Sequence, residues 1–382
     1  MSIVSSDSIL EFKKWNSIYS TDLEEFLSDI GLNQLVVGSL ATRRQGKPSL
    51  KEVIVSDSSG IIGFCSWNLP NVLNLEMDCY LYVNEASHHA VTVIDHFIER
   101  IIRDSCEGEI TRIDLHIEQK QSLSIITAKK KGFFATNDKD TLLTKIAFNG
   151  FIFKGGWSEF SSEFSKLTGR KYPLELPDLK SLINTGIRVE KKSSIHSKCL
   201  NLFDFESIIS PGVILYEGRD CLLLPIKEPY ANDLLGDMAR QRSWLPSKNT
   251  SLLLEKAYFR KASKISYFKK GGLIAFYVSG EKSCKEIVGT ARITYSDVLT
   301  LDQVNLNIHR QGVLSEDALS KMIDKTGKLH VFTFDSFKEF SKKIPFKEAR
   351  EKNLISGANL VTVEKLSFTK LKLLIETATV NE

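Results

Sequence analysis

Apolar and polar residues alternate in several short stretches of the first third of the chain, and this alternation predicts β-strands. Two apolar runs flank the sequence Asp-Ser-Ser-Gly at 57–60, which is typical of a β-hairpin turn. Further strands are expected over 75–83 and 110–117. Between them, apolar residues recur at helical spacing from 91 to 102, so a helix should connect these two strands.

Helical patterns are also expected at the start of the chain, over 6–19 and 20–31. Another short helix should end at Gly132, and a last strand should lie within 145–153. The order of helices and strands indicates a mixed α/β (α+β) fold for residues 1–150.

The rest of the chain divides into two further regions. Residues 151–210 have weak periodicity broken by Gly and Pro, and their polar, basic stretch 188–198 has the composition of a linker. Residues 211–382 contain short apolar runs and few helical patterns, which predicts a small, partly open β-barrel with helices. The expected domains are therefore 1–150 and 211–382, joined by a bridging segment at 151–210.

Length and composition are those of a globular protein, and they agree with the division into two domains and a bridging segment. A chain of 382 residues suggests two or three domains, and a net charge of +4 is too small to indicate nucleic acid by itself. No apolar run is long enough to span a membrane, and the N-terminus lacks the features of a secretory signal, so we expect a cytoplasmic protein with no membrane partner. None of the six Cys forms a C-x-x-C pair, and no metal site is expected.

The first region resembles the GNAT acyltransferase family. The resemblance rests on the hairpin at 53–65, the strand at 78–84 that leads into a loop and a helix, the strand at 111–117, and the helix and turn at 121–134. It implies that acetyl-CoA binds where the central strands separate. In the family, a loop of the form [QR]-x-x-G-x-[GA] offers backbone N–H groups to the pyrophosphate at a helix N-terminus.

Alignment with this loop identifies the residues that would hold the cofactor. Glu85 takes the Arg/Gln position and His88 that of the first Gly, and both depart from the pattern, whereas Ala90 agrees with it. Ala128 replaces a Tyr that often serves as the acid in the family, and Gln121 takes the position of a family Asn. The cofactor-binding residues implied by the resemblance are Tyr82, Val83, Asn84, Ser87, His88, His89, Ala90 and Gln121.

Several residues near this loop have both a functional and an ordinary structural interpretation. Asp114 and His116 alternate along one strand and are candidate bases facing an acceptor cleft, or else residues of the core or rim. His88 and His89 are either phosphate ligands or common loop histidines. Lys129, Lys130 and Lys131 would attract the 3′-phosphate of CoA, or they form a solvated helix face.

The last region, residues 211–376, resembles the PUA-like superfamily of PUA, ASCH and EVE domains. The resemblance rests on the stretches 222–235, 257–279 and 286–293, while the G-x-K-x-x-E-x-R signature of ASCH domains is absent. It implies binding of RNA or DNA, and interleaved aromatic and cationic residues suit that partner. The nucleic-acid candidates are Tyr258, Arg260, Lys264, Tyr267, Lys269, Lys270, Lys347, Arg350 and Asn359. The alternative is that these aromatics belong to the core, the Lys residues to its rim, and the stretch 356–362 to a helix-terminating turn.

Two hypotheses about function follow. In the first, the GNAT-like domain transfers an acetyl group from acetyl-CoA to an amine of RNA or protein that the PUA-like domain presents. In the second, the GNAT-like domain is a catalytically inactive scaffold, and the chain is a nucleic-acid reader or regulator. A toxin–antitoxin or phage-defence operon, with an operon-encoded protein partner, is the setting expected for this second hypothesis.

Overall fold

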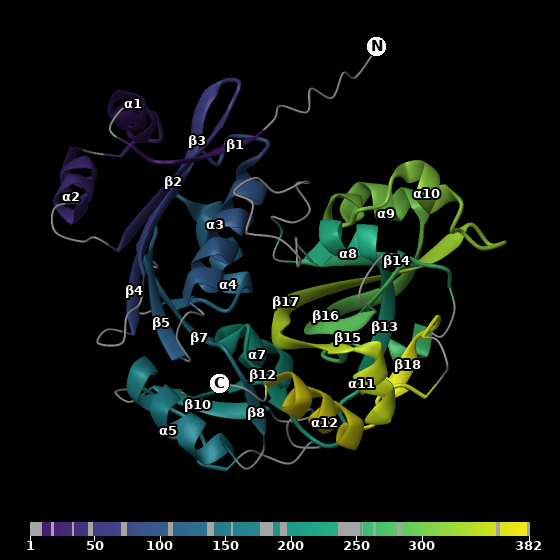
Figure 1. Ribbon diagram of the computed structural model, residues 1–382. Helices are drawn as coiled ribbons and strands as arrows, with labels where there is room; N and C mark the ends of the chain where they lie inside the picture. Colours follow the sequence, from purple (N-terminus) through teal and green to yellow (C-terminus); the bar gives the residue numbers. More distant parts are fainter. Residues whose placement is uncertain are drawn as a thin grey trace.

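The computed structural model contains two large β-sheets, each with its own helices, joined by a middle segment that holds two small sheets (Figure 1). We call residues 10–148 the N-terminal lobe and residues 219–379 the C-terminal lobe. The structure describes residues 10–16, 19–32, 34–44, 49–69, 75–105, 110–135, 141–153, 156–175, 186–191, 197–235, 253, 255–262, 265–280, 285–356 and 360–379. No helix of these described residues is long and apolar enough to cross a membrane.

A seven-stranded sheet forms the N-terminal lobe, with strand order β1-β2-β3-β4-β5-β7-β6. Its strands are β1 (Glu11–Lys14), β2 (Leu50–Asp57), β3 (Gly60–Asn68), β4 (Glu76–Val83), β5 (Ile110–His116), β6 (Phe134–Ala135) and β7 (Leu142–Phe148). Its helices are α1 (Ser20–Asp29), α2 (Gln34–Arg44), α3 (Ala90–Ser105) and α4 (Ser122–Lys130). Of the strand pairs described in this sheet, only β4–β5 is parallel.

Alternation along β4 decides which helix each side chain meets. Leu81 and Val83 join the core on the α3 side of the sheet, whereas Tyr80 and Tyr82 belong to a second core with α1. Successive strand residues point to opposite faces, so one short strand contributes to both cores. The hairpin, the β4 strand and the α3 helix expected from the sequence are confirmed.

One expectation for the first fifty residues was wrong, and one helix there was missed. The segment 6–19 contains the strand β1 instead of a helix, and β1 pairs with β2 from Glu11↔Ser56 to Lys14↔Val53. Leu10 and Phe12, two residues apart, both pack into the core with α3, which is the spacing of a strand. Helix α2 was not expected at all.

The middle segment packs around a core of its own. Its elements are β8 (Phe151–Phe153), α5 (Trp157–Thr168), β9 (Arg170–Lys171), β10 (Ile187–Lys191), β11 (Ser197–Leu200), α7 (Leu202–Ile209) and β12 (Val213–Leu215). The linker-like stretch 188–198 contributes to the antiparallel strands β10 and β11. Ile146 and Phe148 of the N-terminal sheet join this core, so the bridge is packed against that sheet.

The C-terminal lobe is built on a six-stranded sheet of order β14-β17-β16-β15-β13-β18. Its strands are β13 (Cys221–Lys227), β14 (Lys256–Arg260), β15 (Leu273–Ser279), β16 (Glu286–Thr300), β17 (Lys328–Pro345) and β18 (Glu364–Leu366). Its helices are α8 (Glu228–Leu235), η4 (Ile265–Tyr267), α9 (Leu301–Asn307), η5 (His309–Gln311), α10 (Glu316–Ser320), α11 (Phe346–Glu351) and α12 (Phe368–Thr379). Within the described residues the strand order runs from β14 to β18 without closing into a barrel. The mixed α/β (α+β) class is confirmed, while the domain limits stay a prediction.

Helix α7 lies between the two lobes and receives a buried cation from each (Figure 1). Lys145 of β7 donates from Nζ to the carbonyl oxygens of Ser207 and Ile208. Arg292 of β16 donates to the carbonyl oxygen of Phe203 at 2.8 Å and to Ser207 Oγ at 3.1 Å. The last carbonyls of a helix lack partners within the helix, so Lys145 stabilises the negative end of α7. Arg292 instead fixes the side of the helix through Phe203 and Ser207.

Candidate functional site

The parallel strands β4 and β5 separate near their C-terminal ends. Their pairing runs from Glu76↔Arg112 to Tyr80↔His116, and β4 then continues alone to Val83. A cavity of about 370 Å³ lies at this separation. It is lined by Ser39, Tyr80, Tyr82, His116, Ile117, Glu118, Thr141 and Leu142. The separation expected from the sequence therefore exists, with a cavity on the side of Tyr80 and Tyr82.

The two candidate bases of β5 have different surroundings. His116 lines the cavity, stacks on the Tyr80 ring at a centroid distance of 4.3 Å, and places Nε2 3.8 Å from Asp78 Oδ1. Asp114 does not line this cavity, because it accepts hydrogen bonds from Arg112 and Thr144 in the sheet. His116 is the better placed of the two to exchange a proton with a molecule in the cavity.

Both tyrosines of the cavity are constrained. The guanidinium carbon of Arg43 lies 4.1 Å from the centroid of the Tyr80 ring, so Arg43 and His116 cover the two faces of that ring. Burial raises the pKa of Tyr82 well above its ordinary value, so its hydroxyl stays protonated at neutral pH. Tyr82 therefore offers no phenolate for catalysis.

The loop between β4 and α3 satisfies most of its own donors. Asn84 accepts from the N–H of Ala86 through Oδ1 and from the N–H of Ser87 through its carbonyl oxygen. Ser87 accepts from the N–H of His89 through Oγ and from the N–H of Ala90 through its carbonyl oxygen. The rings of His88 and His89 lie against each other with centroids 3.8 Å apart. The turn at 87–90 therefore begins α3 as expected, but three of its four N–H groups, those of Ser87, His89 and Ala90, already donate within the loop.

Two side chains bridge the space between this loop and helix α4. Gln121 donates from Nε2 to the carbonyl oxygen of Val83 at 2.8 Å, and its side chain is buried. Glu85 accepts from the N–H of Leu123 at 3.0 Å and from the N–H and hydroxyl of Ser124 at 2.7 and 2.8 Å. Glu85 thus caps α4.

The residues at this opening do not fit acetyl-CoA. Gln121 already donates to the Val83 carbonyl oxygen of β4, and Glu85, two residues before the turn expected to hold two phosphates, adds a negative charge to this loop. Ala128, at the position of the family acid, is fully buried and has no proton to give. The residues expected to bind the cofactor lie at or near this opening. Several of their donors already hydrogen-bond to other residues of the same group, as Gln121 does to Val83 and His89 to Ser87.

The nucleic-acid candidates of the C-terminal lobe do not form one surface. Tyr258 stacks on Phe332 with ring centroids 5.2 Å apart and donates its hydroxyl to the carbonyl oxygen of Pro225 at 3.4 Å. Arg260 lies 4.8 Å from the centroid of the Phe268 ring, which is buried. Tyr258 is half-buried against the core of this lobe, which favours the alternative that its ring is structural, and its role in nucleic-acid binding stays a prediction.

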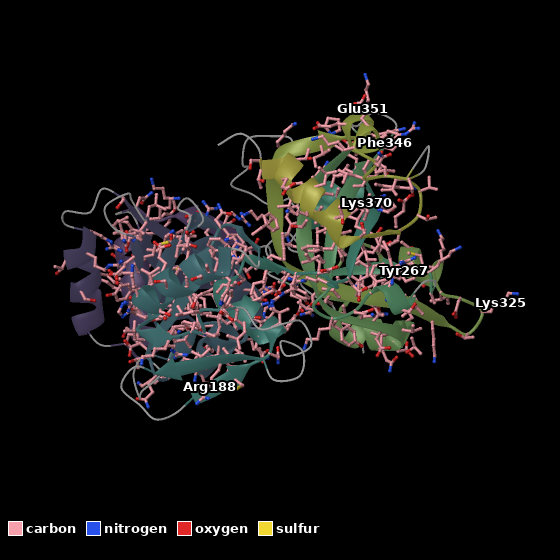
Figure 2. All side chains as sticks on the ribbon, turned by 90° about the horizontal axis from the view of Figure 1, so that it is seen from below. Arg188, Tyr267, Lys325, Phe346, Glu351 and Lys370 are labelled. Carbon is pink, nitrogen blue, oxygen red and sulfur yellow. The ribbon has the colours of Figure 1, made fainter. Side chains whose placement is uncertain are left out.

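A second group of candidates does lie at the surface, where Figure 2 labels Tyr267. The Nζ of Lys365 sits 4.5 Å from the centroid of the Tyr267 ring. Lys269 and Lys270 are both exposed; Lys269 pairs with Asp220 at 2.9 Å, and the Nζ of Lys270 lies 4.3 Å from the ring centroid of Phe203 in α7. We call Tyr267, Lys269, Lys270 and Lys365 the Tyr267 surface.

The remaining candidates lie elsewhere. Lys347 and Arg350 are exposed on α11, whose end residues Phe346 and Glu351 are well separated from Tyr267 in Figure 2. Lys264 and Asn359 fall outside the described residues.

Sequence reasoning missed residues that the fold brings in from far along the chain. Ser39, Glu118 and Thr141 line the cavity, and Lys365 covers Tyr267, although no motif connects any of them to these sites. Among the described residues, no cluster of three His, Cys, Asp or Glu side chains is placed to hold a metal ion.

Comparison with known proteins gives partial likenesses only. No protein-family model and no curated protein matches the chain. The crystal structure of ASCH from Zymomonas mobilis is 12% identical, and the match covers 42% of this chain and 96% of that chain with a TM-score of 0.32. A GNAT-family acetyltransferase from Staphylococcus aureus is 13% identical, with 35% and 89% coverage and a TM-score of 0.29.

A GNAT-family N-acetyltransferase from Escherichia coli, solved in complex with CoA, is 11% identical, with 36% and 81% coverage and a TM-score of 0.28. Both fold types expected from the sequence thus occur among the matches, each over less than half of the chain. Because the identities and TM-scores are low, we argue function from the residues of this chain.

Proposed function

We propose that this protein binds nucleic acid through its C-terminal lobe and that its N-terminal lobe is an acyltransferase-type scaffold without a catalytic cofactor. The observation that carries the proposal is the Tyr267 surface, where a half-buried ring is flanked by exposed cations. An aromatic face surrounded by Lys suits an unpaired base together with its phosphates.

Charge at this surface favours an anionic partner. Asp220 is the acidic group paired with its cations, at 2.9 Å from Lys269 and 3.9 Å from Lys365. These are exposed pairs, which contribute little to stability and are readily exchanged for a phosphate. A single strand is the favoured form, because a base must leave a duplex to stack on a side chain.

Acyl transfer is the second candidate, and the cavity at the separation of β4 and β5 is the observation that favours it. His116 and Glu118 line that cavity and are of the residue types that accept a proton from an amine. The cofactor contacts this activity requires are made instead by Gln121 and Glu85, so we place it second.

Binding of labelled single-stranded RNA and DNA to the full chain tests the proposal. Fluorescence anisotropy with oligonucleotides of about 16 nucleotides, read across a salt series, should show an affinity that falls as salt rises. Lys269→Gln combined with Lys270→Gln should reduce the magnitude of the salt slope by about 1.4, because each lost phosphate contact contributes about 0.7 on single strands.

The matched control neutralises two other exposed Lys residues of the same lobe. Lys321→Gln with Lys325→Gln should leave the slope unchanged, since Lys325 lies well away from Tyr267 in Figure 2. Absence of binding to every oligonucleotide at low salt would refute the proposal.

A further inference from the structure

Glu85 and Gln121 hold the opening between β4 and β5 together from opposite sides. Glu85 comes from the loop after β4 and reaches the first N–H groups of α4, while Gln121 lies just before α4 and reaches back to the last residue of β4. Both side chains therefore link the same two segments, the end of β4 with its following loop and the start of α4. Together they hold the loop against the helix.

We propose that Glu85 and Gln121 form an internal latch that takes the place of a bound cofactor and excludes acetyl-CoA from this lobe. The Glu85 carboxylate occupies an anion site at the N-terminus of α4, where helix N–H groups and the helix dipole favour negative charge. The Gln121 amide donates to the carbonyl oxygen of Val83, which the separation from β5 has left without a strand partner on that side.

The latch excludes the cofactor for two physical reasons. Glu85 is half-buried in the same loop as the turn 87–90, so its negative charge opposes binding of a pyrophosphate at that turn. The turn also has few donors left, because the N–H groups of His89 and Ala90 donate to Ser87.

Burial of Gln121 supports the view that this arrangement is the resting structure of the lobe. Its side chain is 6% exposed, so its bond to Val83 is shielded from competing water. Its Oε1 accepts no hydrogen bond from the described residues, so the bond from Nε2 to Val83 is the contact that orients the amide.

The first experiment measures thermal unfolding of the full chain with and without acetyl-CoA. The wild-type chain should show no rise in Tm at millimolar acetyl-CoA. Glu85→Ala should lower Tm by about 2–4 °C, as expected for a lost helix cap. Glu24→Ala is the matched control, because Glu24 is exposed on α1, and it should leave Tm unchanged. If Glu85→Ala does not fold, Glu85→Gln serves in its place, since its remaining oxygen still accepts a hydrogen bond.

The second experiment restores the missing features of a phosphate-binding loop. Glu85→Arg combined with His88→Gly removes the repelling carboxylate and the bulky side chain, and it should bind acetyl-CoA at least about tenfold more tightly than the wild type by calorimetry. The proposal is overturned if the wild type binds acetyl-CoA, if Glu85→Ala is as stable as the wild type, or if the double variant folds but gains no affinity. None of these outcomes depends on nucleic acid, so they leave the function proposed for the C-terminal lobe to its own test.

Discussion

Among the residues that the structure describes, each lobe contains one parallel pair of strands, and the two pairs end differently. In the N-terminal lobe, β4 and β5 pair up to Tyr80↔His116 and then separate while β4 continues. In the C-terminal lobe, β13 and β15 pair over their whole length, from Cys221↔Leu273 to Lys227↔Ser279. A parallel pair that separates uncovers backbone N–H and carbonyl groups, which must then find other partners.

This difference decides where a ligand can be recognised. The N-terminal lobe has an opening with backbone groups, and two side chains from its own α4 region fill the contacts. In the C-terminal lobe, β13 and β15 do not separate. On the outer side of this pair, β18 pairs with β13, and on the other side β16 pairs with β15. The recognition that we propose for that lobe therefore depends on side chains at its surface, among them those of the Tyr267 surface.

The largest effect is expected where the two lobes meet. Glu206 of α7 is buried and accepts from both Nη atoms of Arg219 and from the N–H of Ile214. Glu206→Ala would leave the Arg219 guanidinium buried without its carboxylate, and we expect a loss of about 3–5 kcal/mol in the free energy of unfolding. Urea unfolding measures this loss.

Hydrogen exchange on the same variant shows whether the two lobes are coupled. Because α7 also receives Lys145 from the N-terminal sheet, amides of β3 and β15 should both exchange faster. Glu217→Ala, at an exposed position, is the control and should change neither lobe. Faster exchange confined to β15 would mean that the lobes are independent.

The next prediction concerns how the free energy of unfolding of the C-terminal lobe changes as the pH falls. Burial, together with the positive charge of Arg260, lowers the pKa of His330 to about 4, whereas an unfolded His titrates near about 6.5. The unfolded chain therefore binds a proton first as pH falls, so this contribution is fully present above pH ~6.5 and is lost towards pH ~4.

We expect the free energy of unfolding to fall by about 2 kcal/mol between pH ~6.5 and ~4.5 because of this one residue. Unfolding curves of the wild type and of His330→Asn across this range measure the difference, and the variant should have the flatter profile. Equal slopes would show that the sheet around His330 is open to water.

A smaller effect is expected at the open pair of the N-terminal lobe. Gln121→Ala removes the donor to the carbonyl oxygen of Val83, and we expect a loss of about 1–2 kcal/mol, as for a buried acceptor left unsatisfied. The control is Ser279→Ala in the closed pair, where Ser279 Oγ donates to the carbonyl oxygen of Ile226 at 3.3 Å. Since Ser279 is half-exposed, water can replace its hydroxyl, and the loss should be under about 0.5 kcal/mol. Similar losses in both variants would contradict the comparison of the two pairs.

Local periodicity predicted those parts of the fold in which many residues repeat one pattern. The hairpin around 57–60, the β4 strand and helix α3 each have apolar residues at regular spacing over eight residues or more, and the structure contains all three. The strand β1 has only four residues, too few to distinguish a strand from a helical turn. Its identity depends on the edge of β2, which lies about forty residues further along the chain.

The candidate site could be located from the sequence, but its contacts could not. Alignment with a family loop placed Glu85 beside a phosphate, yet its partners Leu123 and Ser124 lie 38 and 39 residues away. In the same way, Lys365 meets Tyr267 only because β18 pairs with β13. Contacts of this kind depend on the register of the sheet and on helix placement, which no local pattern specifies.

The smallest effect should come from the ring of the Tyr267 surface, and it tests whether the C-terminal lobe recognises ligands by side chains alone. Tyr267→Ala should weaken binding of single-stranded oligonucleotides by about 1 kcal/mol, about fivefold, through lost stacking. Tyr267→Phe keeps the ring and should bind like the wild type. Because Tyr267 is half-buried beside the core of its lobe, Tm must be measured for both variants. A lower Tm with unchanged affinity for Tyr267→Ala would make the ring a structural residue, and the nucleic-acid contact would then have to come from the cations around it.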